Sequence, residues 1–244
     1  MNRFKKLTKD EKFNLSDKQV RGHLIFRDAE TGKVLHEQDN LVLMRTRVFL
    51  FEHLFGVDPP QEYECARKQY SSENRHICLF KVGSGGADVN ANAFNPYTPK
   101  FSDKDLSQPV PFVIRNIDKD EEVSFQDNVS VYTELTDEMK NLYYLPSTRP
   151  DGSIYYYGKK FNETGSKGWM IDQSTGEIAY SLSMTITEAE CRGYMINEIG
   201  VILAEYDEEN NTYIDPELAT RITFDTESLK NASKAIEIEY IFYI

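Results

Sequence analysis

The chain ends in "KAIEIEYIFYI", a run that alternates residue by residue. In an extended strand, Ile236, Ile238, Tyr240 and Phe242 share one face, while the two glutamates and Ile241 share the other. Shorter runs of the same kind recur along the chain, separated by turn-forming residues. Many short strands with turn signals between them predict antiparallel sheets packed face to face. We therefore expect a mainly β protein, an antiparallel β-sandwich with one early amphipathic helix and long loops.

The other strand signals come from hydrophobic, β-branched and aromatic runs. Two of the runs contain evident hairpin turns, "DAETGK", in which Gly32 supplies the positive φ, and "QSTG". Repeats of 20–50 residues and β-α-β alternation are not visible in the sequence. The segments with strand signals are 21–42, 76–82, 109–117, 129–135, 151–161, 168–186, 194–214 and 218–225.

A single segment has a convincing helical pattern, "NLVLMRTRVFLFEHLFG" at 40–56. Its apolar residues recur at three- and four-residue spacing, which predicts an amphipathic helix over 41–55. Asn40 is the expected N-cap and Gly56 the expected C-cap. The apolar stripe is Met44, Val48, Phe51 and Phe55.

Charge is unevenly distributed along the chain. The formal net charge is −12, but residues 1–21 carry seven Lys or Arg against three acidic residues. We expect residues 1–19 to form a basic N-terminal arm and residues 20–244 to form a single β-sandwich domain. The arm either clasps an acidic neighbour, such as another copy of the chain, or is a solvated terminus. The Tyr- and Gly-rich segment 136–176 is a candidate insertion projecting from the sandwich.

Several classes of protein are disfavoured by composition. The acidic balance argues against nucleic acid as a partner. The sequence has no apolar N-terminal stretch of a secretory signal and no run of 18 apolar residues, so we expect neither secretion nor a membrane partner. The three cysteines, Cys65, Cys78 and Cys191, have no framework spacing and fit a reducing compartment. Synthesis in a cytoplasm is the expectation.

The glycine-rich stretch "KVGSGGAD" resembles a phosphate loop only superficially. A Walker A loop requires Lys followed by Ser or Thr after the last glycine, and a dinucleotide fingerprint requires a helix there. Here Gly83, Gly85 and Gly86 precede Ala87 and Asp88, and the carboxylate of Asp88 would repel a phosphate. We interpret the three glycines as a structural turn that allows close backbone approach.

Metal binding has weak signals. Asp88, Asn90 and Asn92 alternate like calcium ligands, but a calcium loop starting at Asp88 would place Ala93 where Gly is needed and Pro99 where Glu is needed. A nonstandard calcium site near Asp88 stays open.

Zinc and catalytic patterns are weaker still. Cys65, His76 and Cys78 do not have the spacing of a zinc site, and the other histidines are scattered. No nucleophile elbow is present. A glycosidase-like pair is conceivable among Glu188, Glu190 and Glu198, but 40 acidic residues make such proximity uninformative. We expect no enzymatic activity, no cofactor and no metal.

Four stretches taken together resemble virion structural proteins of large tailed bacteriophages. The first is "LFKVGSGGADVNANAFNPYTP" with the following "LSQPVPF", and the second is "MINEIGVILAEY". The third is the C-terminal "LATRITFDTESLKNASKAIEIEYIFYI", and "NLVLMRTRVFLFEHLFG" lies where such proteins place a helix after an N-terminal hairpin. The resemblance covers residues 20–116 and 180–244, whereas residues 117–179 lie outside it.

The resemblance implies a β-rich domain that assembles in several copies into a virion, as a tail, baseplate or neck component. It brings no catalytic residues. Asn197 and Glu198 of "INEIG" are expected to bond backbone at a strand start, and Gly200 to permit a bulge. Partners would be other virion structural proteins and further copies of the chain. The candidate assembly contacts are Arg3, Lys5, Lys6, Tyr155, Tyr156, Tyr157 and Trp169.

A carbohydrate-binding module or fibre-anchoring adhesin is the alternative function. The same aromatic side chains would then stack on sugar rings, although aromatic residues more often fill a sandwich core.

Overall fold

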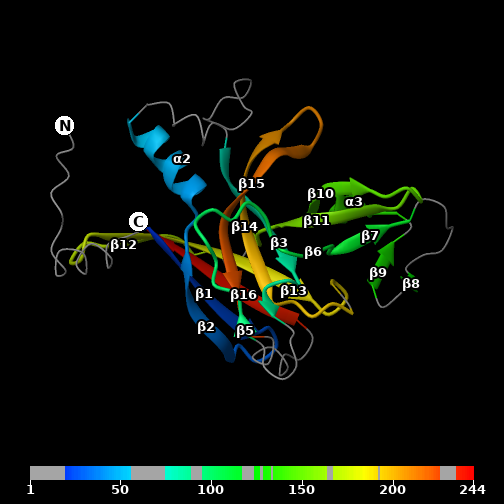
Figure 1. Cartoon of the computed structure of the whole chain (residues 1–244), viewed down its shortest axis with the longest axis horizontal. Helices are drawn as coiled ribbons and strands as arrows, with labels where there is room; N and C mark the ends of the chain where they lie inside the picture. Colours follow the sequence, from blue (N-terminus) through cyan, green and yellow to red (C-terminus); the bar gives the residue numbers. More distant parts are fainter. Residues whose placement is uncertain are drawn as a thin grey trace.

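The computed structural model describes residues 20–55, 75–88, 95–116, 124–126, 129–132, 134–163, 167–191, 193–225 and 235–244. Within these ranges the chain is mainly β, with one helix near the N-terminal end, α2 (Met44–Phe55), as the sequence predicts. Figure 1 shows two sheets that face each other, with α2 standing at one end of them.

The described strands form two large sheets and a small ribbon. In the first sheet the order is β12 (Gly168–Asp172), β13 (Glu177–Thr187), β16 (Ala235–Tyr243), β1 (Arg21–Asp28) and β2 (Val34–Leu41). The main path of the second sheet is β15 (Thr212–Thr223), β14 (Glu198–Asp207), β3 (Arg75–Gly83), β11 (Ile154–Lys160), β7 (Val113–Arg115), β9 (Val129–Tyr132) and β8 (Ser124–Gln126). Off this path, β10 (Tyr143–Thr148) pairs with β11 and β6 (Pro109–Val110) with β3, while β4 (Ala87–Asp88) and β5 (Asn95–Pro96) form the ribbon.

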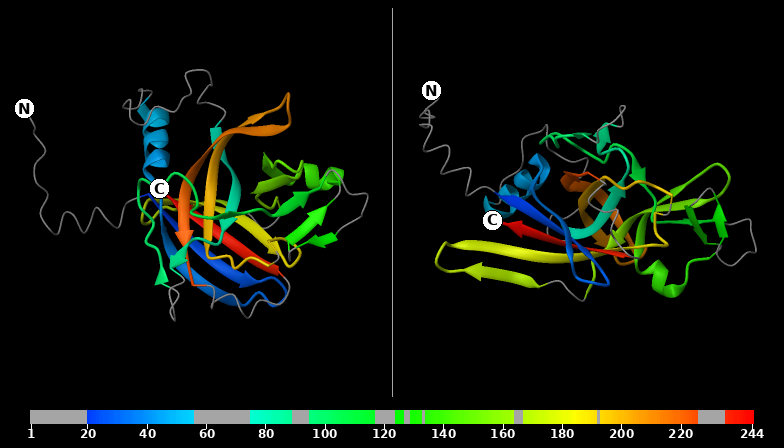
Figure 2. Two further views of the ribbon diagram at one scale, coloured as in Figure 1. Left: turned by 45° about the vertical axis from the view of Figure 1, so that its right-hand side comes forward. Right: turned by 90° about the horizontal axis from the view of Figure 1, so that it is seen from below.

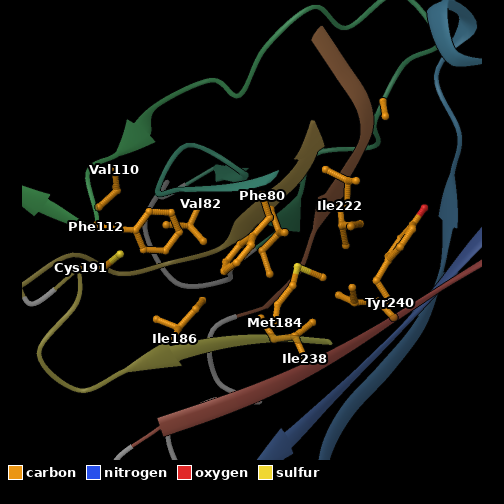
Figure 3. Close-up of a cluster of buried hydrophobic side chains, with 14 of the residues drawn as sticks. Phe80, Val82, Val110, Phe112, Met184, Ile186, Cys191, Ile222, Ile238 and Tyr240 are labelled. Atoms are coloured by element: carbon orange, nitrogen blue, oxygen red, sulfur yellow. The ribbon is translucent and has the colours of Figure 1, made fainter. Parts of the chain in front are cut away.

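The main core lies between the two sheets. Figure 3 shows Met184, Ile238 and Tyr240 of the first sheet facing Phe80 and Ile222 of the second. All five side chains are fully buried. Because both faces of the interface are built from alternating strands, each sheet contributes every second residue to this core. The prediction of an antiparallel sandwich is therefore confirmed, apart from the parallel pairing of β7 with β9.

The C-terminal strand β16 follows its predicted alternation. Ile238, Tyr240 and Phe242 point into the main core. On the opposite face, Glu239 accepts hydrogen bonds from Lys167 at 2.5 Å and from Arg27 at 3.4 Å. The strand is central, between β1 and β13, so both of its edges are hydrogen-bonded.

Both predicted hairpin turns are present. Gly32, with φ of 68°, lies in the turn between β1 and β2, and Gly176, with φ of 74°, ends the turn between β12 and β13. The long β14–β15 hairpin also forms where the sequence predicts it. One difference is that segment 218–225 is not a separate strand but largely the second half of β15.

The helix begins later than predicted. Asn40 is not an N-cap: it lies in β2, paired with Gly22, and its side chain donates to the Tyr240 hydroxyl at 3.4 Å. Strand pairing through Leu41 delays the helix to Met44. The predicted apolar stripe also differs, because Met44 and Val48 are only half-buried, while Phe49 and Leu50 pack against the core and Thr46 is buried. The side chains of Phe51 and Phe55 lie outside the described part.

Segment 136–176 is not a projecting insertion over most of its length. A short helix that the sequence analysis missed, α3 (Asp137–Lys140), is capped by the Thr136 hydroxyl. Strand β11 then pairs with β3 and β7 and belongs to the interior of the second sheet. Its end joins the first sheet, through a bridge from Asn162 to Ser183 and then through β12, and the β12–β13 hairpin is the part that projects.

The N-terminal arm with Arg3, Lys5 and Lys6 lies outside the described residues. The same holds for five other positions named above: Gly56, Cys65, Asn90, Asn92 and Ala93.

Candidate functional site

The glycine turn and the "INEIG" stretch meet at one corner of the sandwich. The Gly86 amide donates to Asn197 Oδ1 at 2.7 Å, and the Asn197 amide donates to the Gly83 carbonyl at 3.0 Å. Asn197 and Glu198 are 1% and 0% exposed. The prediction that these two side chains bond backbone at a strand start is confirmed, since both do so across the start of β14.

The Glu198 carboxylate is bonded on every side. Its oxygens accept from the backbone amides of Gly85 at 3.3 Å, Ser107 at 3.2 Å and Gln108 at 3.0 Å. Arg221 on β15 donates to the same carboxylate from Nε at 3.1 Å and Nη2 at 2.8 Å. A buried carboxylate is stable only when its lone pairs are satisfied in this way.

Arg221 also ties in the loop before β6. Its Nη1 donates to Asp103 at 2.9 Å and its Nη2 to the Ser107 hydroxyl at 2.6 Å. Burial lowers the pKa of Arg221, but the hydrogen bonds to Asp103 and Glu198 outweigh burial, so the pKa lies above its ordinary value. We call Gly83–Gly86, Asp103, Ser107, Gln108, Asn197, Glu198 and Arg221 the Glu198 corner.

The corner glycines are required by close packing. A Cβ on Gly83 would lie 2.5 Å from Glu198 Oε1, and one on Gly86 would lie 2.3 Å from the Asn197 carbonyl oxygen. A Cβ on Gly200 would lie 2.4 Å from Leu218 Cδ1, and the bulge in the β14–β15 pairing falls just after Gly200, between Val201 and Ile202. These glycines act within the chain, as structural turns and points of close approach.

A second buried ionic cluster was not predicted. Lys159 on β11 contacts Glu190 at 2.7 Å and donates to the Thr185 carbonyl at 2.7 Å. The Tyr143 hydroxyl and the Thr187 amide also donate to Glu190. Burial, followed by the Glu190 charge, raises the pKa of Tyr143. The cluster joins β10 and β11 of the second sheet to the end of β13 in the first.

The candidate carboxylate pair does not form. Glu190 and Glu198 are buried in the two separate clusters described above, while Glu188 is exposed. Both buried carboxylates direct their lone pairs to protein donors. No open site with two facing carboxylates arises from these three residues.

Metal ligands are not gathered among the described residues, where no group of three His, Cys, Asp or Glu could hold an ion. The Asp88 side chain lies outside the described part. Cys78 and Cys191 are buried free thiols, and burial raises the pKa of Cys78 to about 12. A thiol with so high a pKa is a poor ligand and nucleophile.

The three consecutive tyrosines of β11 divide between two faces. Tyr156 packs against the main core, whereas Tyr155 and Tyr157 lie on the opposite face with Arg149. The Arg149 guanidinium lies 4.7 Å from the centre of the Tyr155 ring, and its Nη2 donates to the Tyr157 hydroxyl at 3.4 Å. Tyr155 and Tyr157 thus present part of their surface to solvent.

Trp169 belongs to an exposed apolar group on the β12–β13 hairpin. In the strand register Trp169 lies opposite Tyr180, and Ile171 lies opposite Ile178. The Trp169 and Tyr180 rings meet edge to face with centroids 5.5 Å apart. Trp169 is 68% exposed, Ile171 67%, and Ile178 and Tyr180 38% each. We call these four residues the hairpin patch.

The hairpin patch continues the core face of the first sheet. Tyr180 pairs with Phe242, and further along β13 Leu182 and Met184, on the same face, are buried. The hairpin extends past the ends of β1 and β16, beyond the described strands of the second sheet (Figure 2). The patch therefore lies on the face of the first sheet that forms the core, but no described element covers it.

The hairpin tip has a defined shape. Asp172 accepts hydrogen bonds from the Ser174 hydroxyl at 2.6 Å and the Ser174 amide at 2.8 Å, which lower the pKa of Asp172. At its root, the Ser181 hydroxyl donates to Glu239 at 3.1 Å. Bonds at both ends make the patch a preformed surface, which reduces the entropic cost of binding.

Sequence reasoning named Trp169 but missed its three companions. Their alternation with polar residues indicated a buried face, and nothing in the sequence marks where the opposing sheet ends. Lys159 and Arg221 were also missed, because their partners lie 31 and 23 residues away in the chain.

Comparisons with protein-family models, curated proteins and solved structures find no match to this chain. In the described part of the chain, no helix has the length and apolar character needed to cross a membrane.

Proposed function

We propose that this chain is a non-enzymatic virion structural protein, assembled in multiple copies into the tail, baseplate or neck of a tailed bacteriophage. Two lines of argument support the proposal. One is the sequence resemblance described above, whose "KVGSGG", "LSQPVPF" and "INEIG" stretches all contribute to the Glu198 corner. The other is the hairpin patch.

The hairpin patch is the observation that carries the assembly role. A preformed, contiguous apolar surface with a central tryptophan has the composition of an interface core. Aromatic anchors of this kind dominate the binding energy of subunit contacts. By contrast, the buried ionisable groups of the two clusters bond to one another and to backbone, as expected of a scaffold.

Immunogold electron microscopy of purified particles tests the proposal, with antibody raised against this chain. We expect label clustered at the tail end or the neck, and the chain detected in the particles by mass spectrometry. Unlabelled particles that also lack the chain by mass spectrometry, after detergent opening, would contradict the proposal.

A carbohydrate-binding module or fibre-anchoring adhesin is the second candidate. The exposed ring of Trp169 and the Tyr155, Tyr157 and Arg149 group offer stacking and hydrogen-bonding surfaces for a sugar. Trp169 is the sole tryptophan of the chain, so its emission reports on ligand binding directly. A saturable emission change on titration with saccharides, abolished in Trp169→Ala, would favour this candidate over assembly.

A further inference from the structure

The area of the hairpin patch limits what can cover it. From their exposed fractions, the four side chains present on the order of 400 Å² of apolar surface, since large side chains bury roughly 150–250 Å² each. A stable interface between two globular surfaces buries about 800 Å² per partner. The patch is too small for a stable face-to-face dimer and suits a short apolar segment of chain.

The N-terminal arm, residues 1–19, has the composition of such a segment. Its apolar residues are spread among six Lys or Arg and three acidic residues, while the rest of the chain is strongly acidic. Basic side chains beside an apolar anchor favour docking onto an acidic subunit. On the hairpin itself, Asp172 and Glu177 lie opposite each other on the face turned away from the patch, where the basic side chains of a docked arm reach them around the edge strand β12. The apolar residues of the arm are Met1, Phe4, Leu7, Phe13 and Leu15.

The arm precedes β1, and β1 starts at the end of the first sheet from which the hairpin projects. Arg21 pairs with Tyr243 and Tyr243 with Ala179, so β1 starts level with the base of the projecting hairpin, two strands away from β13. Two strand spacings amount to roughly 10 Å. Nineteen extended residues reach about 60 Å, several times farther than the chain's own patch requires. The arm is long enough to reach a neighbouring subunit.

We propose that the hairpin patch binds the N-terminal arm, residues 1–19, of a neighbouring copy of this chain. The inference rests on the proposed multi-copy assembly, because an arm bound to its own hairpin would bury the patch without joining subunits. Phe4 or Phe13 would occupy the surface beside Trp169, and the arm's lysines would reach the carboxylates of Asp172 and Glu177 around the hairpin edge. Each subunit then gives one arm and receives one, a head-to-tail contact that propagates or closes into a ring.

Two full-length variants and their mixture test this contact. The arm variant carries F4S, F13S, K5E and K6E, and the patch variant carries W169S and I171S. Each is expected to weaken self-association by about tenfold or more, as loss of anchor residues does. Mixed together, they retain one intact arm and one intact patch, so a one-to-one complex should form. Light scattering and native mass spectrometry, with one variant isotopically labelled, measure the masses. L54S removes another exposed apolar side chain, on α2, and should leave self-association unchanged.

Three outcomes would overturn the inference. An arm variant that self-associates like wild type would show that other surfaces join the subunits. A monomeric wild type whose Trp169 emission differs from that of the arm variant would place the arm on its own hairpin. A monomeric wild type with the same emission as the arm variant would show that the arm does not dock on the patch.

Particle labelling separates failure of the inference from failure of the proposed function. If the chain is present in virions but its two variants form no complex, the proposed function stands and the proposed arm contact is wrong. If the mixed complex forms but the chain is absent from virions, the arm contact stands and the proposed virion role is wrong.

Discussion

The Glu198 corner and the hairpin patch differ in how completely residues of the same chain contact and bond to them. At the corner, each glycine, carboxylate and guanidinium meets a partner from the same chain within hydrogen-bonding distance. At the hairpin, four core-like side chains extend past the opposing sheet and stay exposed. The corner therefore stabilises the fold, whereas the hairpin patch is a preformed surface that a partner can bind.

The largest loss of unfolding free energy is expected from Glu198→Ala. The substitution leaves the buried guanidinium of Arg221 and the amides of Gly85 and Gln108 without their acceptor. Removing one partner of a buried ion pair costs about 3–5 kcal/mol of unfolding free energy. Urea denaturation measures the loss. Glu188→Ala, which removes an exposed carboxylate, is the control and should change stability by less than about 0.5 kcal/mol. A loss below about 1 kcal/mol at Glu198 would mean that the corner does not hold the fold.

A smaller loss is expected from Gly86→Ala. Its added methyl group would lie 2.3 Å from the Asn197 carbonyl oxygen, so the turn must shift away from β14. Overpacking of this kind costs about 1–3 kcal/mol. Ser84→Ala in the same turn removes only a half-exposed hydroxyl, and its thermal unfolding should match wild type. Equal stability of the two variants would indicate that the corner tolerates backbone movement.

Glu239 on β16 fixes the root of the hairpin by accepting hydrogen bonds from Lys167 and Ser181. Burial raises the pKa of Glu239, but hydrogen bonds from Lys167, Ser181 and Arg27 outweigh it, and the pKa lies below the ordinary 4.5. Because the folded-state pKa is the lower one, the ionised carboxylate stabilises the fold above about pH 4.5, and this contribution is lost as the pH falls through the folded-state pKa.

In Glu239→Gln, the unfolding free energy should therefore fall less between about pH 6 and about pH 3 than it does in wild type. Glu237→Gln, on the exposed face of the same strand, should keep the wild-type profile. Identical acid profiles for Glu239→Gln and wild type would show that the root of the hairpin does not depend on this carboxylate.

The smallest effect on folding is expected at the hairpin itself. Trp169→Ser should change the unfolding free energy by less than about 0.5 kcal/mol, since the side chain is mostly exposed in the free subunit. The same substitution should weaken assembly. A Trp169 variant that unfolds several kcal/mol more easily would mean that the patch serves the fold, and the contrast with the corner would disappear.

Much of the fold follows from local pattern. The alternation of β16 predicted its core face, and turn residues such as Gly32 and Gly176 located the hairpins. The helix start was placed too early because Asn40 has the side chain of a cap, and only the pairing of β2 with β1 reveals that it is still in a strand. Segment 136–176 was predicted to be an insertion because its strand β11 pairs with β3 and β7, which lie far away in the sequence. Local residues give no sign of that pairing.

The candidate site also has one part that local sequence predicts and one part that it does not. The glycines and "INEIG" have local signatures, so their backbone role was predictable. Arg221 and Lys159 were not, because strand register decides which charges meet inside a sandwich. Ile171 and Ile178 alternate with other residues as core residues do, and the distance by which the hairpin extends past the second sheet has no local signal in the sequence.

Hydroxyl-radical footprinting of the chain, free and in purified particles, tests the central claim most directly. We expect peptides spanning residues 168–180 to be oxidised readily in the free subunit and protected in the particle, whereas peptides of the Glu198 corner should be protected in both. Equal oxidation of Trp169 in the free and assembled states would contradict the claim that the hairpin is a subunit contact.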